Sequence, residues 1–403
     1  MRLIHKNFLD FINTENDNEE TFGNFINIIT NYKIQENRYE LKEILRLTLN
    51  IANYHFRSPN FISKIERIIL FFKEKIKQTF SNFEIFQIFK DNKRILLFLF
   101  EQNIIKPDKS IVGVILSEKY QKAKYPLYFF NEISELIEND TKQENEKLIT
   151  DDLEEFKRKR KIGENDSCIS KLIRNDSIDE FISHVNQNCI SLSSMIESSI
   201  YETNSYLLKK QASLIEYAAF FGSAQIFRYL FFNGAKFCPS LWSFAIHGDN
   251  PELISVIEEN NIQLNENLCI ENIDFCKKCL IEAIKCHHIE IADYILKNYI
   301  ECLDECDFVF HSQSLKYYNF LYSPDKLDNS YAFYYLCKYD YFTLVSLLLQ
   351  SKSINVNEKI IPILIFKSSS NFFVLFMKFK KKKIGSNSVY KHIIFNNVLN
   401  HSF

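Results

Sequence analysis

The most regular stretch of the sequence reads Ser213-Leu-Ile-Glu-Tyr-Ala-Ala-Phe-Phe-Gly222-Ser-Ala-Gln-Ile-Phe-Arg-Tyr-Leu-Phe-Phe-Asn233-Gly234-Ala235. Its apolar residues fall at helical spacing on both sides of Gly222, which predicts two short antiparallel helices joined by a tight turn at that glycine. The second helix should end at Asn233-Gly234, where a left-handed cap residue is expected. Ala218 and Ala219 are small enough for the first helix to pack closely against its neighbours.

The same helix pair recurs along the chain with loops of variable length. Each copy has two marker positions eight residues apart, one in each helix: Ala218/Ile226, Ala245/Leu253, Ala283/Ile291 and Leu336/Leu344. Weaker copies lie at 172–181 and 363–375, and Asp249, His287 and Asp340 stand in place of the turn glycine. Because one such pair cannot bury its apolar stripe alone, the repetition predicts a solenoid.

This pattern resembles the ankyrin repeat. The matching residues are Ala218-Ala219, Gly222, Ile226, Leu230 and Gly234-Ala235, and Ser213-Leu-Ile-Glu stands in place of the T-P-L-H turn. Wider segments resemble a large family of uncharacterised ankyrin-repeat proteins expanded in trichomonad protists; they are 158–166, 214–222, 241–248 and 284–288. The resemblance implies an ankyrin fold, and it transfers no activity because the function of that family is not established.

The first 160 residues also predict helices. Leu41–Phe56 and Phe61–Phe80 carry apolar residues at helical spacing and are separated by Ser58-Pro59, a suitable stop and restart. Phe83–Asn103 has the anatomy of a repeat, with Asp91 in place of the turn glycine and Asn103 as the cap. We therefore interpret 1–160 as a helical N-terminal region that holds a degenerate ankyrin-like repeat at Phe83–Asn103; whether the rest of the region belongs to the same solenoid stays open at this point. The ankyrin array follows at 165–383, with its clearest repeats near 211–238, 239–264, 276–300 and 330–357, and 384–403 forms a C-terminal tail.

Composition supports an all-α chain and excludes several classes. Only 7 of the 403 residues are glycine, too few for many tight hairpins, and no glycine-rich phosphate loop occurs. The net charge of −2 argues against general nucleic-acid binding. No apolar run approaches the roughly 18 residues of a membrane span, and no secretory signal is evident. We expect a cytoplasmic protein with reduced cysteines and no membrane insertion.

Cysteine and histidine gather in one part of the chain. The residues are Cys269, Cys276, Cys279, Cys286, His287, His288, Cys302 and Cys306. A C-x-x-C pair can hold two corners of a zinc site, and a cysteine beside a histidine suggests a nucleophile with its base. The remaining spacing is irregular, however, and neighbouring residues on a helix point about 100° apart. The sequence therefore favours structural thiols and predicts no metal or other cofactor.

A basic run follows an acidic one at 151–161. The basic residues are Lys157, Arg158, Lys159, Arg160 and Lys161. Such a run is typical of a nuclear import signal, which would place the protein in the nucleus. The alternative is a helix whose acidic start and basic end suit its dipole, with pairs such as Glu154/Arg158 and Glu155/Lys159.

Partner contacts are predicted at positions where the ankyrin pattern varies. The candidates are Phe220, Phe221, His247, Lys285, Lys338 and Tyr339. The resemblance implies that such residues contact a partner on the concave face; packing on a neighbouring repeat or on the 195–208 insertion is the alternative. We predict an all-α, non-catalytic scaffold that binds a protein partner and no small-molecule substrate. The competing hypothesis is a metal-binding or cysteine-dependent enzyme that uses the 269–306 cluster.

Overall fold

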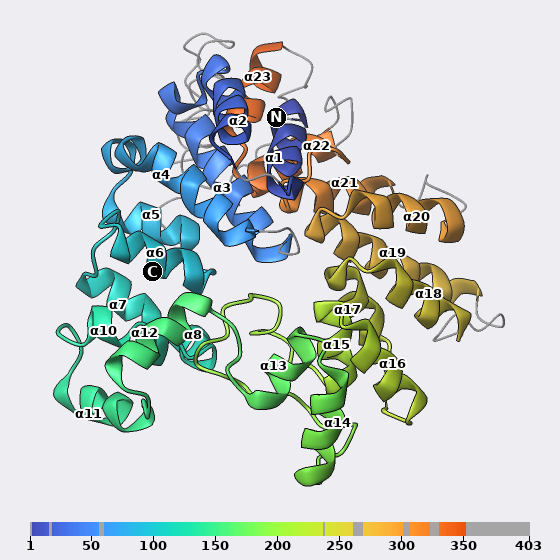
Figure 1. The fold of residues 1–403 in the computed structure, drawn as a ribbon. Helices are drawn as coiled ribbons and strands as arrows, with labels where there is room; N and C mark the ends of the chain where they lie inside the picture. The colour runs from blue at the N-terminus through green and yellow to red at the C-terminus, as the bar shows by residue number, and fades with distance from the viewer. Residues whose placement is uncertain are drawn as a thin grey trace, which may run out of the picture. The chain divides into compact units, whose positions relative to one another are not determined.

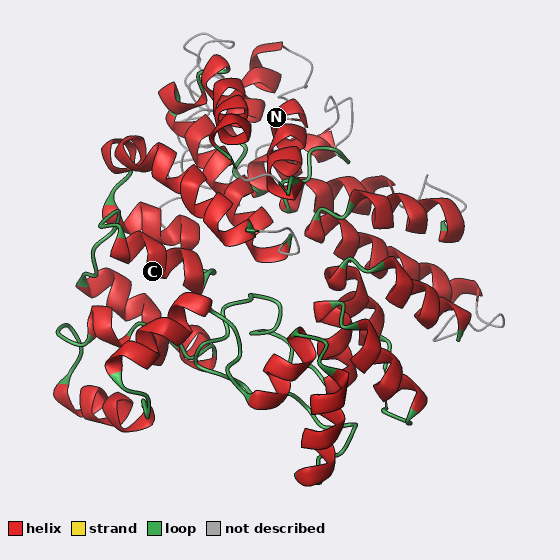
Figure 2. Ribbon diagram, viewed as in Figure 1, coloured by secondary structure: helices red, strands yellow, loops and turns green. Residues whose placement is uncertain are grey.

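The computed structural model describes residues 2–15, 18–55, 60–236, 238–260, 269–300, 307–322 and 330–351, and within these ranges only the backbone of 269–274, 307–309, 330–332 and 349–351. The described residues form helices with no β-strand among them, which confirms the all-α class (Figure 2). The chain divides into two compact units, Met1–Tyr322 and Ser323–Phe403.

Twelve α-helices and a short 3-10 helix lie in the first half of the larger unit, counted over its described residues (Figure 1). They are α1 (Arg2–Asn13), α2 (Glu19–Asn31), η1 (Ile34–Glu36), α3 (Arg38–Tyr54), α4 (Phe61–Thr79), α5 (Asn82–Phe89), α6 (Lys93–Glu101), α7 (Lys109–Ile115), α8 (Glu118–Lys122), α9 (Tyr125–Tyr128), α10 (Phe130–Ile133), α11 (Asn139–Leu148) and α12 (Leu153–Ile162). The break between α3 and α4 falls where Ser58-Pro59 predicts it.

The turn between α5 and α6 differs from the sequence prediction. Asn103 does adopt the left-handed conformation expected of the cap, with φ of 53°. Asp91 does not, because Asn92 is extended and caps α6 by accepting a hydrogen bond from the Ile95 amide. The Asp91 carboxylate instead accepts hydrogen bonds from Lys119 and Tyr120. Asp91 is therefore not a substitute for the turn glycine.

Helix pairs fill the second half of the larger unit. The helices are α13 (Cys168–Arg174), α14 (Ile178–Gln187), α15 (Leu214–Phe221), α16 (Ala224–Phe232), α17 (Ser240–Gly248), α18 (Pro251–Glu259), α19 (Cys269–Cys286), α20 (Ile289–Tyr299) and α21 (Asp307–Lys316). The residue that ends each first helix is left-handed: Asp176, Gly222, Asp249, His287 and Tyr318 have φ between 49° and 66°. The predicted turns at Gly222, Asp249 and His287 are confirmed, as is the left-handed Gly234, with φ of 81°. Tyr318 lies between the marker positions Ala283 and Leu336, which are 53 residues apart and between which the sequence pattern shows no repeat.

A ladder of side-chain hydrogen bonds links consecutive turns. In each of four turns the residue after the left-handed position donates to a carbonyl oxygen of the preceding turn. The pairs are Ser223 to Ile173, Asn250 to Gly222, His288 to Ile246 and Asn319 to Ile284. In three of these turns the same carbonyl oxygen also accepts from the amide of its own left-handed residue, so the side chain adds a second hydrogen bond. The ladder fixes the register of one pair on the next.

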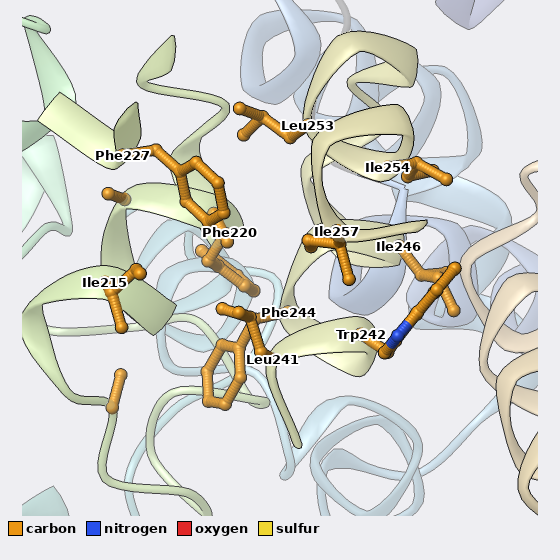
Figure 3. Packing of buried hydrophobic residues seen from close by; sticks show 14 of the residues in the cluster. Ile215, Phe220, Phe227, Leu241, Trp242, Phe244, Ile246, Leu253, Ile254 and Ile257 are labelled. Carbon is orange, nitrogen blue, oxygen red and sulfur yellow. The ribbon is translucent and has the colours of Figure 1, made fainter. Parts of the chain in front are cut away.

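The first helices of the pairs pack in one row. α13 contacts α15, α15 contacts α17, α17 contacts α19 and α19 contacts α21, while α16 contacts both α14 and α18. Figure 3 shows Phe220, Leu241, Phe244 and neighbouring apolar side chains packed between these helices. α15 and α17 approach so closely that a Cβ atom on Gly248 would lie 2.2 Å from the Ala219 carbonyl oxygen. Ala218 and Ala219 are fully buried, which confirms the predicted close packing.

The smaller unit contributes one described helix pair. α22 (Ser330–Lys338) and α23 (Phe342–Ser351) are joined through left-handed Asp340, with φ of 65°, as the sequence predicts. The weak copy at 363–375 and the tail at 384–403 lie outside the described residues.

Candidate functional site

The predicted partner-binding positions of α15 and α17 are covered by the chain itself. Tyr206, in the loop that precedes α15, stacks parallel to Phe220 with ring centroids 5.9 Å apart, and its centroid lies 3.9 Å from that of His247. Phe220 and His247 are fully buried. Phe221 is partly buried against Tyr217. Phe220 and His247 therefore pack on the insertion, and their side chains are not available to a partner in this conformation.

Lys285 of α19 is also largely covered. Its ammonium lies 4.7 Å from the ring centre of Tyr54 and 4.9 Å from that of Tyr206, and it pairs with Glu282 at 2.5 Å. In the smaller unit, Lys338 is exposed and Tyr339 is partly exposed, stacked on Tyr335. Lys338, Tyr339 and, in part, Phe221 are thus the predicted contacts that remain accessible.

His247 joins a carboxylate to a thiol. Its Nε2 lies 2.6 Å from Oε1 of Glu282, and its Nδ1 lies 3.3 Å from Sγ of Cys286. A neutral imidazole with its proton on Nε2 satisfies both contacts, donating to the carboxylate and accepting from the thiol. The order thiol, imidazole, carboxylate is that of a cysteine nucleophile with its base and an orienting group. Sequence reasoning pairs Cys286 with His287 or His288 instead, because His247 lies on a different helix.

Burial sets the protonation of this group. Burial raises the pKa of Glu282, but the hydrogen bond and charge of His247 and the charge of Lys285 outweigh this effect and lower that pKa to about 2. Burial, followed by the charge of Glu282, holds the pKa of the Cys286 thiol well above its usual value. Since the thiolate is the reactive form, these surroundings disfavour nucleophilic chemistry. The Cys286 side chain is fully buried.

The same three residues are the metal-ligand candidate with the best convergence. Within the described ranges, His247, Glu282 and Cys286 form the one group of three His, Cys, Asp or Glu residues whose ligand atoms lie within 4.8 Å of one another. A single ion would need these atoms to point to one place. Here the imidazole lies between its two partners and uses a different nitrogen for each, so the geometry suits a hydrogen-bonded relay better than coordination.

The C-x-x-C pair lies apart from this relay. Cys276 and Cys279 are buried on α19 and face a small apolar space bordered by Trp242, Ile295 and Tyr299. Burial raises the pKa of both thiols. The side chain of Cys269, and Cys302 and Cys306 entirely, lie outside the described residues. No set of four cysteine or histidine ligands forms in the part of the chain that is described.

Four buried histidines join the N-terminal helices to the row of helix pairs. Nε2 of His5 lies 2.9 Å from Nδ1 of His287, and Nδ1 of His55 lies 3.0 Å from the carbonyl oxygen of Cys286. The ring of His55 meets that of His288 edge-on. Burial lowers the pKa of His5 to about 3 and that of His55 to about 4, and it lowers that of His287 well below its usual value. We call His5, His55, His287 and His288 the histidine seam.

The basic run at 157–161 lies on α12 and is largely used in ion pairs. Lys157 pairs with Glu154, Arg158 with Glu155, and Lys159 with Asp151 and Asp166. Arg160 is buried and pairs with Glu132, while Lys161 is exposed. The acidic start and basic end lie on one helix, as the helix alternative expects, and its Glu155/Lys159 pair forms at 3.9 Å. Its Glu154/Arg158 pair is replaced by Lys157–Glu154 and Arg158–Glu155, one residue closer along the helix. An import role for the run stays a prediction.

None of the helices in the described ranges combines the length and the hydropathy that crossing a bilayer requires. A scan against models of known protein families, and searches of curated proteins and of solved structures, find no match to this chain.

Proposed function

We propose that the chain is a non-catalytic scaffold, built as an ankyrin-like solenoid, that binds a protein partner. The observation that supports it best is the recurrence of one unit, a helix pair with a left-handed turn, whose first helices pack in a single row. The turn ladder ties each pair to the previous one, so little conformational entropy would be lost when a partner binds. The ankyrin pattern around Gly222 supports the same interpretation.

The accessible predicted contacts provide the test. Full-length tagged protein is compared with the variant Lys338→Glu/Tyr339→Ala and with a control, Lys147→Glu/Tyr32→Ala, which makes the same chemical changes at exposed positions of α11 and beside α2. Captured proteins are identified by mass spectrometry and then tested for direct binding as purified proteins. The proposal expects a partner that binds wild type and control and binds the Lys338/Tyr339 variant at least about tenfold more weakly. Equal binding by all three, or no direct partner, would contradict it.

The thiol–imidazole–carboxylate geometry favours one alternative, a cysteine-dependent activity. In that case Cys286 of the native protein should react with iodoacetamide at least as fast as exposed Cys168, Cys189 and Cys238. The scaffold proposal expects those three to be modified while Cys286 is protected. Elemental analysis after dialysis tests the metal variant of this alternative, which requires about one zinc per chain.

A further inference from the structure

A lysine-rich cavity lies on the larger unit, away from the Cys286 relay. Its volume is about 320 Å³, within the range of about 300–1,000 Å³ of small-molecule sites. Part of the wall comes from the end of α8 and the residues that lead into α9, which supply Lys122 and Lys124; another part comes from the loop before α15, which supplies Lys209 and Lys210. Figure 1 shows this loop running between α8 and α13.

Positive charge exceeds negative charge around this cavity. Four lysines line it, against the carboxyl groups of Glu197 and Glu202. Burial raises the pKa of Glu202 to about 7, so that carboxyl group is partly protonated at neutral pH. The excess is local, because the whole chain carries a net charge of −2.

Lys209 is the lysine with the fewest compensating contacts. Lys122 pairs with Glu118, Lys124 donates to the Ser198 carbonyl oxygen, and Lys210 donates to the Tyr206 hydroxyl. The Lys209 side chain makes no hydrogen bond or ion pair with any described residue. Partial burial holds the pKa of Lys209 below its usual value. The charge of Asp91 opposes this effect, and the smaller contributions of Lys285, Lys119 and Lys316 add to it. Like charges from three helices, α8, α19 and α21, thus act on this side chain, and none of those three lysines lines the cavity.

We propose that this cavity binds a small molecule that carries two or more phosphate groups. Lysine ammonium groups are compact point charges that suit phosphate. Several of them around one cavity favour binding of a ligand that carries several negative charges. Bound phosphate would give the Lys209 ammonium a direct ion-pair partner and would connect the α8–α9 segment to the loop that carries Tyr206. This ligand is independent of the protein partner proposed above.

Isothermal titration calorimetry of the full chain with inorganic tripolyphosphate tests the site. Orthophosphate and citrate serve as comparisons, the first with a single phosphate group and the second with carboxylates only. The proposal expects tripolyphosphate to bind, more tightly than either comparison, with an affinity that falls as salt is added. No measurable heat or shift of thermal unfolding with tripolyphosphate would overturn the site, and equal binding of citrate would overturn the phosphate class.

Matched variants locate the binding. Lys209→Ala/Lys210→Ala should weaken tripolyphosphate binding about tenfold, since each of the two exposed lysines contributes roughly 0.7 kcal/mol. Lys147→Ala/Lys297→Ala removes the same charge from exposed positions on α11 and α20 and should leave the affinity within about twofold. Glu197→Gln should strengthen binding about twofold. An equal loss of tripolyphosphate affinity in the two double-lysine variants would overturn the assignment to this cavity. Circular dichroism checks that each variant is folded.

Discussion

The two halves of the larger unit are tied together in different ways. In 168–322 one short turn is repeated, and from the second turn on the residue after the left-handed position bonds back to the preceding turn. In 1–162 individual long-range contacts take that role. Lys64 donates to the carbonyl oxygens of Ile12 and Thr14, and Lys93 to those of Ile200 and Glu202; both ammonium groups are buried.

This difference separates local from distant causes of stability. A turn that depends on one residue's backbone preference leaves a mark in the sequence, because Gly, Asp and Asn tolerate positive φ. A buried lysine that reaches a carbonyl group tens of residues away leaves none, and burial lowers the pKa of Lys93 to about 7. Variants in each half should therefore respond differently, and they are ordered below by the expected effect on stability.

Gly248→Ala should cause the largest loss. The added Cβ would meet the Ala219 carbonyl oxygen at 2.2 Å, so α15 and α17 must separate, at about 3 kcal/mol or more. Gly113→Ala in α7 is the control, since nothing lies within 4 Å of its Cβ position and alanine favours a helix by about 0.5–1 kcal/mol. Urea unfolding measures both. Equal stabilities for the two variants would show that the row is not closely packed.

Mild acid should weaken the histidine seam. The pKa values of His5 and His55 are about 3 and 4 in the folded chain, against about 6.5 in the unfolded chain, so the unfolded state binds more protons below pH 6.5. Their contribution to the free energy of unfolding is complete well above pH 6.5. It falls by about 1.4 kcal/mol for each histidine between pH 7.5 and 5.5. His5→Gln/His55→Gln should reduce this loss, whereas His184→Gln on α14 should leave it unchanged. If the free energy of unfolding of the double variant fell with pH as steeply as that of wild type, the histidine seam would not be the source of the acid sensitivity.

Removing one rung of the ladder should have the smallest of these effects. Asn319 is buried and donates to the Ile284 carbonyl oxygen, so Asn319→Ala should lower the free energy of unfolding by about 1–2 kcal/mol. Asn298→Ala removes a similar bond on the exposed face of α20 and should stay within about 0.5 kcal/mol of wild type. Equal losses from the two would mean that the ladder adds nothing beyond an ordinary surface bond.

The sequence predicts the helix pairs and several of their turns because these are local features. The turns at Gly222, Asp249 and His287 follow from spacing and residue type. Asp91 shows the limit, since its neighbour Asn92 makes an equivalent turn in extended conformation. The turn at Tyr318 has no such mark in the sequence, because tyrosine rarely adopts positive φ.

The surroundings of the candidate site could not be predicted in the same way. His5 lies 282 positions from its partner His287, and His55 lies 231 positions from Cys286. Tyr206 covers Phe220 and His247 from a loop that has no repeat pattern. These contacts depend on how distant segments meet, and a single sequence carries no periodic signal for that.

The central claim is that the N-terminal helices and the row of helix pairs form one cooperative unit joined by the histidine seam. Trp242, the sole tryptophan of the chain, is buried on α17 and reports the row by fluorescence. Pulsed hydrogen exchange with mass spectrometry, in the same urea series, measures the protection of the backbone amides of α3 and α4. The account predicts one urea midpoint for both signals. Loss of protection in α3 and α4 while Trp242 fluorescence remains native would contradict it.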